Sequence, residues 1–413
     1  MKNRETINST IEDIFYLASC ALNNQAPDIQ RISEMDSNLV FTGAAFHSVE
    51  ALTYYAFKLC DLGISLKDRA TGADMAIMHK AFGISEELLA KWNEAYKRST
   101  IKNVQLDSGR RELFEAMEEQ GCWHLPLKGV ILKDMYPAAG MRQMSDNDIL
   151  FDESFRPWVK EWFESQGYKT EIYDTSYDDV FFKPPYRLYE MHVSLVGNDD
   201  KLWWPYYKDI KDRLVKVDGT NCEYAFTDED YYIYMMVHAY KHYRGGGTGI
   251  RIFFDTYVYL NNKKECLDWD YIYRECGRLQ IEEFEKSIRK LSMKVIGNKG
   301  PWIDVLSESE QKIMYYIIGS GTYGTVNNRI KNGVEDSSGG KVTIIGKIKF
   351  LFTRIFLPKE VMYMHHPLCR KHHWLLPFYY LKRIIKGLFQ KRIYDEVGRV
   401  VKMKSEEANN INE

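Results

Sequence analysis

The chain has 413 residues, of which 45% are hydrophobic and 14% aromatic, enough to build more than one hydrophobic core. Its 56 Lys and Arg nearly balance 58 Asp and Glu, and the formal net charge of -2 argues against a nucleic-acid-binding protein on charge grounds. The seven cysteines are widely spaced and include no CxxC pair, which argues against a disulfide framework or a zinc ribbon.

No targeting or membrane signal is visible in the sequence. The N-terminal residues lack the apolar run and small-residue cleavage site of a secretory signal, and no stretch reaches the roughly 18 apolar residues of a membrane span. We therefore expect a soluble, cytoplasmic protein with reduced thiols.

The first 120 residues have the periodicity of helices. Apolar residues recur at three- and four-residue intervals in segments such as IEDIFYLASCAL and GRRELFEAMEEQG. Ser9 and Glu12 have the spacing of a capping box, which predicts that a helix begins near Ser9. The sequence therefore predicts a helical N-terminal region over residues 1–120.

Residues 121–225 change to a period of two, which is typical of strands. The candidate strands are WHLPL, NDILF, YKTEIY, DVFFK and YRLYEMHVSL, and an amphipathic helix, FRPWVKEWFESQG, separates the second from the third. This pattern predicts a small mixed sheet with helices, so that the whole chain belongs to the α+β class.

The remainder of the chain is predicted to be mainly helical. Residues 226–320 are expected to form a helical domain, whose first helix Thr227 can cap. Residues 321–345 are rich in Gly, Ser and Asn, which predicts a flexible linker. Residues 346–413 are expected to form a basic amphipathic helical tail.

The tail has two open interpretations. Between Lys341 and Arg392 it carries twelve Lys and Arg against one acidic residue, Glu360, interspersed with apolar runs. Such a helix can contact an anionic membrane or an acidic partner, or it can be a packing helix with a solvated basic face. A cluster of potential zinc ligands also lies in the tail, but it lacks a ligand pair from a second segment and is more typical of surface residues: His365, His366, Cys369, His372 and His373.

Two aspartates at the start of a strand predict a metal site. Asp146 and Asp148 are separated by one residue. In an extended segment their carboxylates therefore project from the same face, roughly 6.5 Å apart. A third acid, Glu190, lies in a later strand. Three acids on adjacent strands repel one another unless cations neutralise them, which favours bound Mg²⁺ or Mn²⁺. The alternative is an Asx-rich turn entering a strand.

Several residues near the acids are candidates for nucleotide binding. Gly129 lies at a strand-to-helix turn where a backbone N–H can approach a phosphate. Lys128 can neutralise a phosphate and Arg142 can bind one bidentately, although either can instead form a salt bridge with the acids. His192 shares the strand face of Glu190 and can contact an acceptor or hydrogen-bond an aspartate.

A helical segment further along the chain offers additional candidates. His238 and His242 lie at i and i+4 with Lys241 beside them, a spacing that can present polar groups into a cleft or serve a structural role. Asp255, near the start of the next helix, can interact with a helix dipole or form a salt bridge.

The order of these motifs resembles the DNA polymerase β-like nucleotidyltransferase superfamily, and more closely an uncharacterised bacterial nucleotidyltransferase family. The resemblance rests on LKG at residues 127–129, Tyr136-Pro137, Arg142, Asp146-x-Asp148 and Glu190-x-His192. Two positions depart from the superfamily pattern: Val130 follows Gly129 where Ser or Gly is common, and Glu190 stands where Asp is commoner.

The resemblance implies a polymerase β-like core between helical regions and a Mg²⁺-dependent transfer of NMP from an NTP to an acceptor by a two-metal mechanism, with release of pyrophosphate. It makes Asp146, Asp148 and Glu190 the catalytic metal ligands. The residues implied in nucleotide binding are Lys128, Gly129, Arg142 and Lys241, and those implied near the acceptor are His192, His238 and His242.

Other functions remain open from the sequence. An Asp-x-Asp glycosyltransferase also binds a metal under a nucleotide sugar, but about 120 helical residues precede the pair where that fold places a nucleotide-binding half. A non-catalytic protein that binds a nucleotide or a partner is the other alternative. The near-neutral charge favours a small-molecule or protein acceptor over nucleic acid.

Overall fold

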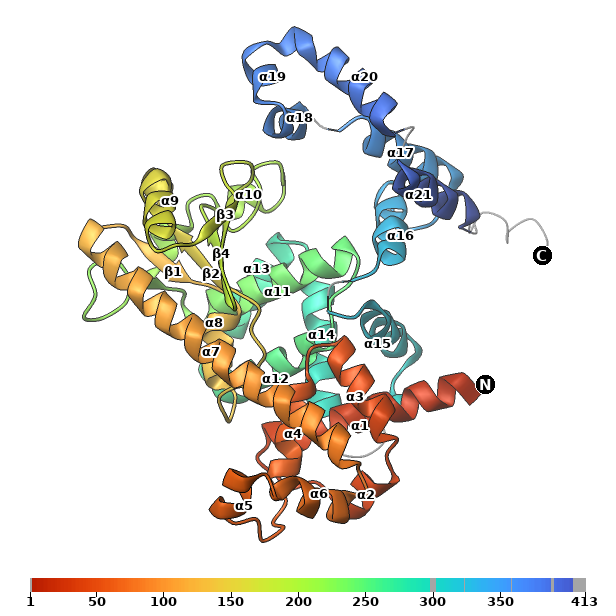
Figure 1. Ribbon diagram of the computed structural model, residues 1–413. Coiled ribbons are helices and arrows are strands. Elements are labelled where there is room, and N and C mark those ends of the chain that lie inside the picture. The colour runs from red at the N-terminus through yellow and green to blue at the C-terminus, as the bar shows by residue number, and fades with distance from the viewer. Residues whose placement is uncertain (1, 298–301, 323, 358, 388–389, 404–413) are drawn as a thin grey trace, which may run out of the picture. The chain divides into compact units, whose positions relative to one another are not determined.

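The computed structural model (Figure 1) describes residues 2–297, 302–322, 324–357, 359–387 and 390–403. The chain separates into two compact units, one formed by residues 1–238 and 250–315 and the other by residues 239–249 and 316–413. The first unit thus contains both the helical N-terminal region and the strands. Within the described ranges, no helix has the length and apolar character that crossing a bilayer requires.

The N-terminal region is helical, as predicted. Its helices are α1 (Lys2–Leu22), α2 (Ile29–Glu34), α3 (Ser37–Phe46), α4 (Glu50–Lys58), α5 (Leu66–Thr71), α6 (Asp74–Phe82) and α7 (Glu86–Gln120). The long helix α7 begins where the Ser85 side chain accepts the N–H of Leu88, and it ends at Gly121, whose φ of 75° favours glycine.

The predicted helix start at Ser9 is wrong. Helix α1 already begins at Lys2, so Ser9 lies inside it. The Glu12 carboxylate does not close a capping box and instead accepts the backbone N–H groups of Trp302 and Ile303. A long-range contact has therefore replaced the local one that the spacing suggested.

The predicted strands form a mixed sheet in the order β1-β2-β5-β4-β3. They are β1 (His124–Pro126), β2 (Asn147–Phe151), β3 (Lys169–Ile172), β4 (Asp178–Lys183) and β5 (Arg187–His192). Strands β2 and β5 are parallel, while the other neighbours are antiparallel. Helix α8 (Gly129–Leu132) follows β1, and the predicted amphipathic helix, α9 (Arg156–Ser165), follows β2.

Alternation along the strands separates a hydrophobic face from a polar one. The side chains of Ile149, Tyr189 and Met191 are fully buried in a core with Phe163 of α9 and Leu113 of α7. Because successive strand residues point to opposite faces, Asp148, Glu190 and His192 lie on the other face of the sheet. Figure 1 shows α7 running along the sheet.

Short elements and further helices follow the sheet. They are α10 (Trp204–Tyr207), β6 (Val215–Lys216), β7 (Tyr224–Ala225), α11 (Asp228–Gly245), α12 (Arg251–Lys263), α13 (Trp269–Arg278), α14 (Glu282–Gly297) and α15 (Glu308–Ser320). The predicted cap of α11 is confirmed, because the Thr227 hydroxyl accepts the N–H of Asp230 at 3.1 Å.

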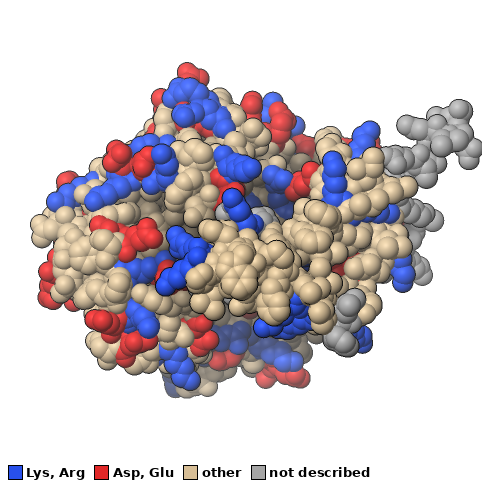
Figure 2. All heavy atoms as spheres, turned by 90° about the horizontal axis from the view of Figure 1, so that it is seen from above, with Lys and Arg blue, Asp and Glu red and all other residues tan. Residues whose placement is uncertain are grey.

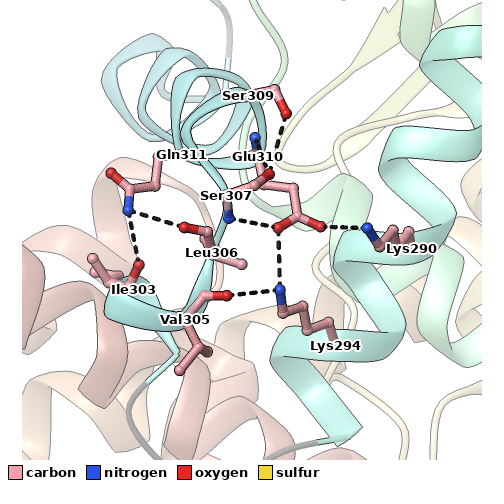
Figure 3. Close-up of polar contacts among 9 residues, drawn as sticks. All are labelled: Lys290, Lys294, Ile303, Val305, Leu306, Ser307, Ser309, Glu310 and Gln311. Carbon is pink, nitrogen blue, oxygen red and sulfur yellow. Dashed lines mark hydrogen bonds and ion pairs between the residues drawn. The ribbon is translucent and has the colours of Figure 1, made fainter.

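A capping box and two ion pairs join α14 to the start of α15 (Figure 3). The Ser307 hydroxyl accepts the N–H of Glu310, and the Glu310 carboxylate accepts the N–H of Ser307 at 2.8 Å. The same carboxylate pairs with Lys290 and Lys294 of α14 at 3.0 and 3.1 Å. These contacts fix the end of α14 against the next helix.

The second unit contains the helical tail. Its remaining helices are α16 (Val326–Asp336), α17 (Ile344–Ile355), α18 (Lys359–His365), α19 (Pro367–Lys371), α20 (Leu376–Gly387) and α21 (Lys391–Lys402). The segment predicted as a flexible linker therefore includes a helix. Thr325 caps α16, and its side chains Ile330 and Val334 pack against Phe350 and Val400. The apolar spacing of Ile330 and Val334 is hard to see in the sequence because Gly and Asn residues surround them.

Candidate metal and nucleotide site

Strands β2 and β5 bring three potential metal ligands together. Asp148 and Glu190 are paired residues of the parallel ladder, and His192 lies two residues beyond Glu190 on the same face. The ligand atoms of these three residues all lie within 4.8 Å of one another. His192 Nε2 is 3.0 Å from Asp148 Oδ1 and 3.8 Å from Glu190 Oε2.

Lys128 supplies the positive charge of this cluster. Its Nζ atom lies 2.6 Å from Asp148 Oδ1 and 3.7 Å from Glu190 Oε2. Lys128 occupies the turn between β1 and α8 with φ 50° and ψ -123°, a conformation that costs an L-residue about 1–3 kcal/mol. The buried Tyr231 of α11 donates a hydrogen bond to the Lys128 carbonyl at 2.6 Å. The fold thus holds a strained residue so that its ammonium meets the acids.

The acids of the cluster have different proton affinities. Burial alone would raise the pKa of Asp148, but Lys128 and His192 outweigh it and hold that pKa below its usual range. Burial and the Asp148 charge raise the pKa of Glu190 to about 8. Loss of the Glu190 proton is thus disfavoured, and a cation that binds Glu190 competes with that proton.

Asp146 is set apart from the cluster. It precedes the first residue of β2 and is partly exposed, and it does not belong to the group whose ligand atoms meet. Burial, followed by the charge of Asp148, raises the pKa of Asp146 to about 6, so the two carboxylates are close enough to interact. Its role as a metal ligand stays a prediction.

Gly129 and Arg142 pack against each other under the turn. A Cβ atom on Gly129 would lie 2.2 Å from Arg142 Nη1, so only glycine fits there without movement. The Arg142 Nε and Nη2 atoms donate to the two carboxylate oxygens of Asp255 at 2.8 and 2.9 Å, and the Tyr136 hydroxyl donates to the same carboxylate. Asp255 is therefore a salt-bridge partner of Arg142. Since Asp255 already occupies the guanidinium group, Arg142 would have to leave this salt bridge to bind a phosphate, and that role stays a prediction.

Helix α7 holds the segment that leads into β2. The Ser99 hydroxyl donates to the Gly140 carbonyl at 2.8 Å, and the Asn103 amide donates to the Arg142 carbonyl at 3.1 Å. This face of α7 therefore runs beside the chain that ends at the acidic pair. The contacts explain how a helix distant in sequence contributes to the site.

Two cations that the sequence analysis missed lie close to Asp146. Lys102, on α7, and Arg251, at the start of α12, are half-buried, and Arg251 donates to the Gln143 carbonyl at 2.9 Å. Burial lowers the pKa of Lys102, while the Asp146 charge opposes that effect; burial and the nearby Arg142 lower the pKa of Arg251. Neither Lys102 nor Arg251 forms an ion pair with a carboxylate of the described residues. No local motif marks them, since both approach the site through tertiary packing.

The predicted residues on α11 divide between the two units. His238 is the last residue of the helix that belongs to the first unit, whereas Lys241 and His242 belong to the second. Their roles in binding nucleotide or acceptor stay predictions. Tyr231 and Tyr234 lie on the same helix, and burial together with the Asp148 charge raises the pKa of Tyr234 against the opposing effect of Lys128.

No zinc site is found among the described side chains of the tail. The described residues contain one group of His, Cys, Asp and Glu able to share a metal ion, and it is the cluster on β2 and β5. The His365 side chain lies outside the described residues. The Cys369 side chain is buried, and the interpretation of the tail histidines as surface residues stays a prediction.

Comparison with known proteins identifies the family. The model of a family described as uncharacterised nucleotidyltransferase matches residues 33–297. The chain belongs to this family. The match confirms the resemblance carried by the LKG turn and the acidic motifs, and it implies a transferase. The search of curated proteins found no match, and neither did the search of solved structures.

Proposed function

We propose that the protein transfers a nucleoside monophosphate from an NTP to a small-molecule or protein acceptor. The observation that carries the proposal is the convergence of Asp148, Glu190, His192 and Lys128 within the residues that the nucleotidyltransferase family matches. Family membership favours this reaction over the glycosyltransferase alternative.

The residues of the cluster fit a divalent cation. Two carboxylates suit Mg²⁺, and an imidazole nitrogen extends the donor set toward Mn²⁺. The partial burial of the ligands excludes competing water and strengthens electrostatic interactions. When bound, the cation would neutralise triphosphate charge and polarise the α-phosphate. Asp146, two residues before Asp148, is proposed as a further ligand.

The surrounding cations would hold the triphosphate. Lys128 can turn its ammonium from Asp148 to the β- and γ-phosphates, while Lys102 and Arg251 approach from α7 and α12. An acceptor oxygen would then form a bond to the α-phosphorus as the bond to the bridging oxygen breaks, and pyrophosphate leaves. Glu190, once ionised, would take the proton of the acceptor hydroxyl.

Calorimetric titration tests the proposal. The four NTPs and a panel of UDP-sugars are titrated with and without Mg²⁺ into the wild type, Asp146→Asn/Asp148→Asn and the matched control Asp152→Asn, which keeps a cap just beyond β2. We expect Mg²⁺-dependent NTP binding that the double variant loses and the control retains. α-Labelled NTP then identifies the acceptor. Binding of UDP-sugars without preference for NTPs would refute the proposal in favour of a glycosyltransferase.

A further inference from the structure

One face of α17 packs into the core of the second unit. Phe350 lies in that core, and its ring approaches Gly333 of α16 so closely that a Cβ there would lie 2.4 Å away. Gly346, one turn earlier on the same face, is buried against Ser338. This face alone therefore packs α17 against the rest of the second unit.

The opposite face of α17 is also apolar, but it is uncovered. Its side chains are 44% to 63% exposed: Ile344, Ile345, Ile348, Phe352 and Ile355. With 3.6 residues per turn they occupy an arc of roughly 100°, centred opposite Phe350. A helix with two apolar faces is normally buried on both, so the exposed face requires a partner.

Helix α20, which contacts α17, carries a second exposed apolar face. Side chains of α20 and the preceding 3-10 helix (His373–Leu375) are 49% to 76% exposed: Trp374, Phe378, Leu381 and Ile385. Helix α20 adjoins α17, because Arg383 donates to the Arg354 carbonyl at 3.3 Å and the rings of Phe356 and Tyr380 are 5.8 Å apart. Both faces therefore belong to one unit.

Basic side chains border these faces. They are Lys349 on α17 and Lys382 and Lys386 on α20. In helical projection Lys349 and Lys382 lie about 40° beyond the edge of the exposed apolar arc of their helix, and Lys386 about 80° beyond it, where long cationic side chains can reach outward from an apolar layer. Arg383 lies opposite the apolar arc of α20, and Arg354 pairs with Glu396 at 2.7 Å. Figure 2 shows Lys and Arg side chains set among uncharged ones on the face seen from above.

We infer that the exposed apolar residues of α17 and α20, with their flanking lysines, form a surface that binds an anionic phospholipid bilayer. We call it the basic apolar surface. Amphipathic helices of this composition lie in the plane of the bilayer, with the apolar side chains among the acyl chains and the cations at the phosphates. Large aliphatic side chains give no favourable contact with a nucleic-acid backbone, which argues against that partner.

The inference does not depend on the proposed reaction. The basic apolar surface lies beyond residues 33–297, which the nucleotidyltransferase family matches. The electrostatic match also distinguishes a lipid surface from a second copy of the chain, since twelve Lys and Arg against one acidic residue between Lys341 and Arg392 would repel the same segment of another copy.

Vesicle flotation of the full-length protein tests the inference. Vesicles contain phosphatidylcholine alone or with phosphatidylglycerol, at low and high salt. We expect binding only to the anionic vesicles, weakened by salt. Ile348→Asp/Phe352→Asp should reduce the affinity about 100-fold or more, because two apolar side chains lose their insertion. Lys382→Gln/Lys386→Gln should reduce it about 25-fold, since each cation contributes roughly a fivefold factor near an anionic surface.

The matched control changes exposed valines of the first unit in the same way. Val215 and Val305 are 53% and 58% exposed, and Val215→Asp/Val305→Asp should leave vesicle binding unchanged. Circular dichroism checks that each variant is folded, and Asp148→Asn should still bind vesicles, which separates this surface from the metal site. Absence of binding to anionic vesicles would overturn the inference. An equal loss of vesicle binding in the valine control would also overturn it. So would a protein that self-associates without binding vesicles and that Ile348→Asp/Phe352→Asp dissociates.

Discussion

Replacing Lys128 by methionine should strengthen divalent-cation binding and weaken nucleotide binding. The Lys128 ammonium lies 2.6 Å from Asp148 Oδ1 and 3.7 Å from Glu190 Oε2, so an incoming dication meets a positive charge on its own ligands. Methionine keeps most of the apolar length of the side chain and removes the charge. A fold defect would weaken both kinds of binding, so opposite changes are specific to the proposed role of Lys128.

The size of the effect follows from the contact that Lys128 gives up. A hydrogen bond between charged groups is worth about 1.5–3 kcal/mol. In the wild type, Mn²⁺ has to break the Lys128–Asp148 hydrogen bond in order to bind Asp148, so removing that bond should raise the Mn²⁺ affinity about 10- to 150-fold. The NTP affinity should fall about tenfold or more, because a cation near the β- and γ-phosphates is removed.

Mn²⁺ titration followed by electron paramagnetic resonance measures the first effect, and calorimetry with NTP measures the second. Lys133→Met is the matched control. Lys133 is also largely buried, but its ammonium pairs with Asp107 at 3.0 Å and Asp134 at 2.6 Å. It should leave Mn²⁺ affinity unchanged. A lower Mn²⁺ affinity in Lys128→Met would refute the assignment of its ammonium as the competitor of the metal.

Four further changes test the surroundings. Asp255→Asn leaves the buried Arg142 guanidinium without its carboxylate and should lower the free energy of unfolding by about 3–5 kcal/mol in urea titrations; a loss below about 1 kcal/mol would contradict this. Gly129→Ala should cost about 1–3 kcal/mol by the same assay, because its Cβ meets Arg142; an unchanged midpoint would show that Arg142 moves freely. Mn²⁺ affinity should rise as pH increases toward 8, since Glu190 must lose its proton; a pH-independent affinity would argue against Glu190 as a ligand. The pKa of Glu310 is lowered to about 2, because the Ser307 N–H and two lysines outweigh burial. The stability that ionised Glu310 contributes is therefore full above the usual carboxyl pKa and is lost as pH falls through 2. Glu310→Gln should lower the free energy of unfolding by about 0.5–2 kcal/mol at neutral pH and by less in acid, and a pH-independent difference would contradict the lowered pKa.

Local patterns predicted the elements of the sheet and the acids on them. The period of two identified every strand of the sheet, and the apolar spacing of FRPWVKEWFESQG identified α9, because these signals are contained in short segments. Asp148 and Glu190 were recognised for the same reason. Their meeting depends on β5 pairing with β2, a parallel neighbour that the chain reaches only after forming β4 and β3.

Contacts between distant segments could not be predicted. Glu12 has the spacing of a capping box, yet the packing of residues 302 and 303 provides it with other donors. The Gly and Asn residues of α16 predict a linker because they are typical of loops, whereas Ile330 and Val334 gain their helical register from packing against α17. The pairing of Arg142 with Asp255 is of the same kind.

Lys102 and Arg251 show why tertiary packing is needed to interpret the site. A protein that buries a cation normally pairs it, because an uncompensated charge is costly away from water. Both side chains are half-buried, and Asp146, the nearby acid, has a raised pKa and supplies only partial compensation. A triphosphate would supply the missing negative charge at the point where α7 and α12 hold the segment leading into β2. The same helices that hold the segment leading into β2 also position these cations, so that the proposed catalysis by preorganised charge would depend on residues well outside the acidic motif.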